Sequence, residues 1–87
     1  MTEVIRFTAS WCGPCKVLSP IFQQLSEEFG GKATFKTVDI NNQSDYAAQN
    51  KVSSVPTIII FKDGQEVQRH IGVKPKTTYV SNFTAIL

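Results

Sequence analysis

The order of the first three segments most constrains how this chain can fold. Residues 3–9, "EVIRFTA", alternate apolar and more polar side chains, which is the pattern of a strand. Apolar residues then recur at helical spacing until Gly30-Gly31, where a helix should end. Residues 33–40, "ATFKTVDI", form a second extended run. A strand, a helix and a strand in this order predict two parallel strands joined by a right-handed crossover.

The rest of the chain adds a short polar helix, a hairpin and a last helix. We expect the polar helix in residues 41–51, capped within Asn41–Ser44, and a hairpin over residues 56–72 that turns at Asp63-Gly64. The last helix begins near Pro75. Its apolar face is expected to carry Tyr79, Val80, Phe83, Ile86 and Leu87. Pro20 should kink the first helix, because it lacks an N–H group.

These segments predict an α/β fold of order β-α-β-α-β-β-α, with a four-stranded mixed sheet flanked by helices. At 87 residues the chain has room for one domain, residues 1–87, and 41% hydrophobic content is enough for one core.

Nine Lys and Arg against seven Asp and Glu are scattered along the chain, which argues against nucleic-acid binding. No apolar run approaches the ~20 residues of a membrane helix. With no leader-like apolar segment at the N-terminus, we expect a cytoplasmic protein. We also expect it to be a monomer.

The two cysteines, Cys12 and Cys15, stand where the first strand meets the first helix. A thiol at a helix N-terminus has its thiolate stabilised by free N–H groups and by the helix dipole. Cys12 is therefore expected to attack, and Cys15, one turn further and more buried, to resolve the product. Gly13 leaves room for a substrate backbone, and Pro14 stiffens the loop.

Three other interpretations of the cysteine pair are weaker. A closed zinc site needs four ligands, and the only other soft ligand is His70, in a different element. A structural disulfide across so few residues would constrain little chain entropy. Two core cysteines are disfavoured because Cys12 lies at the end of a strand. Dithiol chemistry is the leading hypothesis.

Several motifs along the chain resemble the thioredoxin family. They are "ASWCGPCK", "PIFQQL", "VDIN", "VSSVPTIIIFKDGQEV" and "IGVKPK". The resemblance implies a protein-disulfide reductase that holds no bound cofactor and receives electrons from NADPH through thioredoxin reductase. Ribonucleotide reductase and peroxiredoxins are family-level candidates for its targets.

The resemblance also implies a substrate-binding rim around the cysteines. Trp11 would be an apolar platform, Val55 would offer its backbone to the substrate, and Pro56 would be a cis proline. Gly72 and Val73 would complete the rim. Each residue has an alternative interpretation: Pro56 as an ordinary trans proline, which would be favoured without the cysteine motif, Trp11 as a core residue and Gly72 as a turn residue. His70 is expected to be a solvated residue of the edge strand.

The chain departs from the family pattern in two respects. The family usually has a further strand and helix before the strand that leads to the cysteines, so the second strand here should be a sheet edge, blunted by Lys32 and Lys36. The family also usually has a buried Asp where this chain has Arg6, and a Lys where it has Thr37. Arg6 either reaches solvent or pairs with Asp39, or it stabilises a thiolate as a nearby cation.

Two other functions are kept as alternatives. A glutaredoxin-like, glutathione-coupled reductase is similarly short, but such proteins usually have Pro-Tyr between the cysteines. A non-catalytic binding subunit with a thioredoxin fold could use the exposed sheet edge. Turnover with glutathione, or activity that survives loss of both cysteines, would indicate one or the other.

Overall fold

A computed structural model describes all residues, 1–87, as four strands and three helices. In chain order they are β1 Thr2–Thr8, α1 Gly13–Phe29, β2 Thr34–Asp39, α2 Ser44–Gln49, β3 Thr57–Lys62, β4 Gln65–Ile71 and α3 Lys76–Ile86. The order β-α-β-α-β-β-α is the predicted one. Helix α1 ends at Phe29, directly before the Gly30-Gly31 pair, and Pro20 lies inside it as expected.

The strands form one mixed sheet in the order β2-β1-β3-β4. Strand β1 pairs parallel with β2, and β3 pairs antiparallel with both β1 and β4. The predicted crossover and hairpin are thus confirmed, and β2 is an edge strand. Lys36 on β2 is exposed and forms an ion pair with Glu3 of β1.

The hairpin turns at the predicted Asp63-Gly64 pair. Both residues have positive φ, 51° for Asp63 and 84° for Gly64. Two successive residues in the left-handed region make a turn whose twist matches that of the strands, and Asp and Gly tolerate that region best. Helix α2, in contrast, has Gln43 as its N-cap with no side-chain hydrogen bond, so it lacks the side-chain cap that is typical of Asn or Ser.

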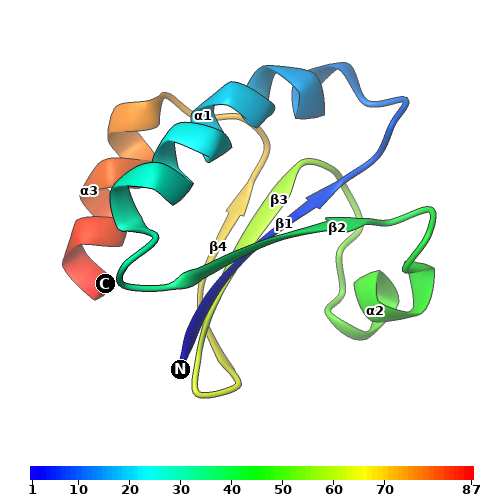
Figure 1. Cartoon of the computed structure of the whole chain (residues 1–87). Coiled ribbons are helices and arrows are strands. Elements are labelled where there is room, and N and C mark those ends of the chain that lie inside the picture. Colours follow the sequence, from blue (N-terminus) through cyan, green and yellow to red (C-terminus); the bar gives the residue numbers. More distant parts are fainter.

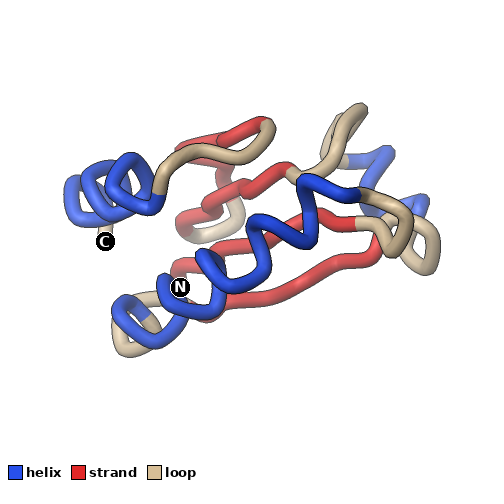
Figure 2. The backbone as a smooth tube through the Cα atoms, turned by 90° about the horizontal axis from the view of Figure 1, so that it is seen from above, coloured by secondary structure: helices blue, strands red, loops and turns tan.

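The helices cover the two faces of the sheet unequally. In Figure 1, α1 and α3 lie on one side of the twisted strands and α2 on the other. Figure 2, turned by a quarter, shows α1 and α3 as separate rods beside the strands. The larger core lies under α1 and α3, and its buried members are Val4, Leu18, Phe22, Leu25, Phe29, Ile58, Ile60, Tyr79 and Phe83.

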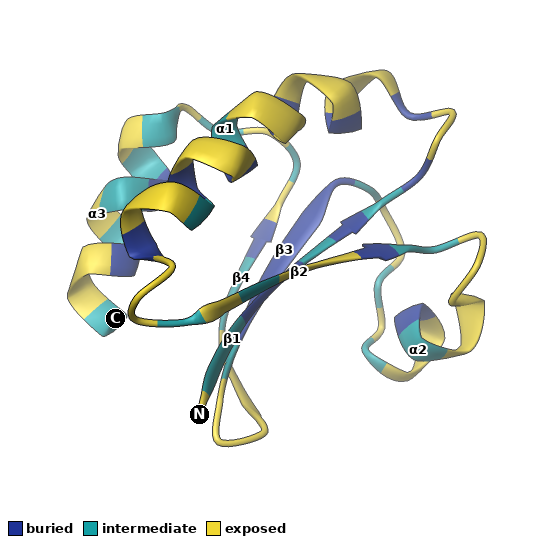
Figure 3. Ribbon diagram, in the orientation of Figure 1, coloured by how far each residue is buried: buried dark blue, intermediate teal, exposed yellow.

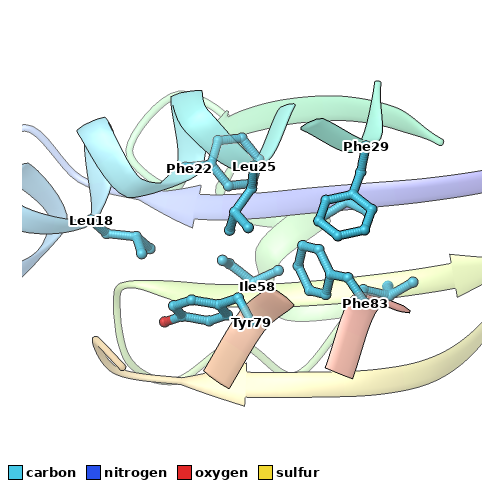
Figure 4. Packing of buried hydrophobic residues seen from close by; sticks show 9 residues of the cluster. Leu18, Phe22, Leu25, Phe29, Ile58, Tyr79 and Phe83 are labelled. Carbon is cyan, nitrogen blue, oxygen red and sulfur yellow. The ribbon is translucent and has the colours of Figure 1, made fainter. Parts of the chain in front are cut away.

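Figure 4 shows the packing of this core: side chains from α1 face Tyr79 and Phe83 of α3 around Ile58. The central strand β3 is buried along nearly all of its length (Figure 3). A smaller cluster under α2 contains Ile5, Phe7, Val38, Ala47 and Ile59. Packing on both faces of the sheet holds β1 in place, and the two cysteines follow in the chain directly after β1.

Candidate active site

Cys12 is the N-cap residue of α1. Its backbone is extended (φ −92°, ψ 111°), and its sulfur accepts a hydrogen bond of 3.1 Å from the backbone N–H of Cys15. Pro14 occupies the first turn, where a missing N–H group is harmless. The sulfur therefore lies at the positive end of a helix dipole, with an N–H group directed at it. Such a position stabilises a thiolate and favours nucleophilic attack.

Cys12 and Cys15 are joined in a disulfide, with their Cα atoms 5.3 Å apart. Cys15 is the more buried of the two, as expected, but only narrowly: Cys15 is 2% exposed and Cys12 4%, so the expectation of an exposed Cys12 is wrong for this oxidised form. Ala9 belongs to the same small cluster as the two cysteines, and Ile40 and Val55 pack against it. These apolar neighbours cover Cys12 nearly as well as the helix covers Cys15.

The loop before β3 faces the cysteines. The Val55–Pro56 peptide bond is cis, as predicted, and Pro56 is fully buried. The carbonyl oxygen of Val55 lies 3.6 Å from the sulfur of Cys12. Thr57 fixes the end of this loop, because its hydroxyl donates a 2.7 Å hydrogen bond to the carbonyl of Ser54. The fold thus brings a backbone carbonyl next to the sulfur of the attacking position.

Gly72 is tied to the same loop. Its N–H group donates a 2.9 Å hydrogen bond to the carbonyl of Pro56, and its φ of +83° is one that side-chain-bearing residues rarely adopt. Val73, which follows it, is 38% exposed, and Trp11 is 69% exposed. Trp11 is therefore not a core residue. Gly13, between the cysteines, would have nothing within 4 Å of an added Cβ, so the space beside its Cα is open.

Arg6 lies on β1, beneath α1. Its Nη1 donates a 2.9 Å hydrogen bond to the hydroxyl of Ser19, and its Nη2 donates a 3.1 Å hydrogen bond to the hydroxyl of Thr37. The guanidinium stands 4.8 Å from the ring centre of Phe22. The expected pairing with Asp39 is wrong: that carboxylate accepts the N–H of Asn41 instead. Partial burial lowers the pKa of Arg6, which has no carboxylate partner.

His70 was expected to be solvated, and this expectation is wrong: the residue is 5% exposed. Its ring packs against Tyr79 and Phe83 of α3, at 5.4 Å and 6.2 Å between centres. Nδ1 lies 3.3 Å from the ammonium of Lys74, and Nε2 lies 2.9 Å from the side-chain oxygen of Gln68. An ammonium can only donate, so Nδ1 accepts and Nε2 carries the proton of a neutral ring. Burial, helped by Lys74, lowers the pKa of His70.

Tyr79 links this region to the rim. Its hydroxyl accepts the N–H of Lys74 at 3.0 Å and donates to the carbonyl of Gly72 at 3.3 Å. Burial raises the pKa of Tyr79, so its hydroxyl keeps the proton that it donates. Sequence reasoning assigned Tyr79 only an apolar face. Strand alternation alone does not indicate the burial of His70, because Val67 and Ile71, the apolar residues of β4, alternate with it and are exposed.

Comparison with known proteins agrees with this geometry. The family model described as "Thioredoxin" matches residues 2–85. The chain belongs to the thioredoxin family. Two similar relatives are the thioredoxins of Staphylococcus aureus strains Mu50 / ATCC 700699 and MW2. Each is 40% identical over 74 residues, which is 85% of this chain and 71% of the relative.

A member of the thioredoxin family with Cys12 and Cys15 in a disulfide is a thiol–disulfide oxidoreductase. The thioredoxin fold predicted from the sequence is confirmed. None of the three helices combines the length and the apolar content that a membrane-spanning segment needs. The structure contains no group of three or more His, Cys, Asp or Glu side chains that could hold a metal ion.

Proposed function

We propose that this protein is a reductant of protein disulfides in which Cys12 attacks and Cys15 resolves. The observation that carries the proposal is the sulfur of Cys12, placed at the N-cap of α1 with the Cys15 N–H directed at it. The Cys15 side chain lies within the first turn of the same helix. The order of attack follows from these two positions.

In the first step the Cys12 thiolate attacks one sulfur of a target disulfide. A Cys12–target disulfide forms, the target S–S bond breaks, and the second target sulfur leaves as a thiolate. Cys15 then loses its proton, attacks Cys12 and releases the first target sulfur as a thiolate. The target gains two electrons, and the protein loses two as the Cys12–Cys15 disulfide forms.

The rim residues have separate roles in this proposal. Trp11 and Val73 offer apolar contact area next to the disulfide, and Gly13 leaves room for a substrate backbone. The Val55 carbonyl, 3.6 Å from the sulfur of Cys12, accepts a substrate N–H group. Gly72 ties the loop of Pro56 to the end of β4, because its N–H group donates to the Pro56 carbonyl. Pro14 keeps the loop between the cysteines short and stiff.

NADPH would regenerate the dithiol through thioredoxin reductase. Candidate targets are disulfide-containing proteins such as ribonucleotide reductase or a peroxiredoxin. We propose a monomer that works in the cytoplasm, where thiols are kept reduced, and that binds neither membranes nor nucleic acid. The scattered charge of +2 is consistent with this choice of partners.

Reduction of insulin with NADPH and thioredoxin reductase tests the proposal. The parent should turn over, and Cys12→Ser should lose all turnover, because it lacks the attacking sulfur. Cys15→Ser is the matched variant: it should also lose turnover but accumulate a covalent insulin adduct that a thiol releases. Turnover that requires glutathione instead of the reductase would indicate a glutaredoxin-like protein. Full biological activity without both cysteines would indicate a binding subunit.

A further inference from the structure

A chain of two hydrogen bonds joins Arg6 to the resolving cysteine. The guanidinium donates to the hydroxyl of Ser19 at 2.9 Å. That hydroxyl in turn donates to the backbone carbonyl of Cys15 at 3.2 Å. Ser19 lies four residues after Cys15 on α1, a rise of about 6 Å along the helix. The positive charge therefore stands beneath the part of α1 that follows Cys15, against Ser19 and Phe22, and is linked through Ser19 to the Cys15 backbone.

The guanidinium is held in this place by three different contacts. Thr37 of the edge strand accepts from Nη2, Ser19 accepts from Nη1, and the ring face of Phe22 lies against the cation at 4.8 Å. Its Nε is buried without a partner, and no carboxylate neutralises the charge. Arginine stays protonated at every pH at which the protein works. The site therefore has a fixed, unpaired positive charge.

Other charged groups on the surrounding elements are placed differently. Lys16 of α1 is exposed next to Cys15, and Asp39 at the end of β2 accepts the N–H of Asn41. Lys36 of β2 is paired with Glu3, and the neutral His70 on β4 bonds Lys74 and Gln68. Of all these groups, only Arg6 is linked to Cys15 by hydrogen bonds, which run through the Ser19 hydroxyl to the Cys15 carbonyl.

We propose that Arg6 is a positioning residue that stabilises the thiolate of Cys15 in the resolving step, an inference that rests on the proposed order of attack. The proton that Cys15 loses passes to water or to the thiolate released by the target, because a guanidinium cannot accept it. Arg6 thus lowers the free energy of the anion without being the base.

The size of the effect follows from Coulomb's law. A unit charge roughly 10 Å away, at an effective dielectric constant of about 40, shifts a thiol titration by about half a pH unit. This corresponds to about threefold in the thiolate fraction below the titration midpoint. A less basic thiolate is also a weaker nucleophile, so the resolving rate should change only about twofold. The thiol titration is therefore the sharper measurement.

The test compares Arg6→Met, Arg6→Lys and Arg6→Asp in the reduced full-length protein. Ultraviolet absorbance of the thiolates is followed against pH, and the pair is described by its apparent titration values. Arg6→Met should move the upper titration about half a pH unit higher, and Arg6→Asp further. Arg6→Lys, which keeps the positive charge, should have an upper titration close to that of the parent. Lys36→Met is the matched control, because it removes an exposed cation from the neighbouring strand.

A purely structural role for Arg6 predicts a different result. In that case Arg6→Met and the parent would titrate alike while their thermal unfolding differed, and the proposal would be overturned. An equal shift in Lys36→Met would overturn it as well, since net charge alone would then be the cause. If Arg6→Asp does not fold, the titrations of Arg6→Met and Arg6→Lys still distinguish thiolate stabilisation from a purely structural role. Insulin reduction by the parent tests the proposed function separately.

Discussion

Arg6 and His70 lie at two positions of one row across the sheet, yet they are kept in opposite charge states. In the register of the strands, Arg6 of β1 is paired with Ile58 of β3, and Ile58 is paired with His70 of β4. Ile58, between them, is 1% exposed. Both polar residues are buried at least in part against the helices α1 and α3. One remains a cation and the other a neutral ring.

Their neighbours explain the difference. Arg6 meets two hydroxyl oxygens and the electron-rich face of Phe22, all of which favour a cation. His70 lies next to the ammonium of Lys74, and this positive charge disfavours a cationic imidazole ring. Burial lowers the pKa of both groups, but only histidine has an ordinary pKa near neutrality, so only histidine loses its charge. The fixed charge therefore lies on β1, against α1, and the neutral ring lies on β4, against α3.

The largest predicted effect comes from removing the residue between the two. Ile58→Ala should reduce the free energy of unfolding by about 2–5 kcal/mol, because it opens a cavity in the larger core. Urea denaturation of the oxidised protein measures it. Ile71→Ala is the matched control: Ile71 is 58% exposed on the neighbouring strand β4, and its loss should change stability by no more than about 0.5 kcal/mol. Equal losses in the two variants would contradict the packing described here.

The next effect is a dependence of stability on pH. The pKa of His70 is lower in the folded protein than its ordinary value of 6.5, so between these two values the unfolded chain binds more protons. The free energy of unfolding should therefore fall as the pH drops from neutral through about 6.5 towards the lowered value. His70→Phe keeps a neutral ring next to Tyr79 and should remove this contribution. Urea titrations at several pH values check it, and a parallel pH dependence in both proteins would exclude His70 as its source.

Much of the fold could be predicted from local patterns. The strand alternation of residues 3–9, the Gly30-Gly31 stop and the Asp63-Gly64 turn each have a local physical cause, and all three are found in the structure. The resemblance supplied the cis conformation of Pro56, which local preference alone would have put as trans. The N-cap of α2 lies within the expected range, at Gln43, but its side chain makes no cap hydrogen bond.

The parts of the site that could not be predicted depend on contacts between distant segments. The burial of His70 needs the rings of Tyr79 and Phe83 from α3, and that of Cys12 needs Val55 from a loop far along the chain. Partners for Arg6 could not be chosen from the sequence, because Ser19 and Thr37 are ordinary polar residues until the strands fix their register. Asp39, the expected partner, has the right charge but bonds locally.

The smallest predicted effect separates the two hydroxyls that hold Arg6. Ser19→Ala and Thr37→Val each remove one acceptor from the guanidinium, and each should cost about 0.5–1 kcal/mol of stability. Only Ser19 also donates to the carbonyl of Cys15. Ser19→Ala should therefore raise the upper thiol titration by about one or two tenths of a pH unit, while Thr37→Val leaves it unchanged. The same absorbance titration measures both, and an equal shift in the two variants would show that the link through Ser19 has no special part in placing the charge.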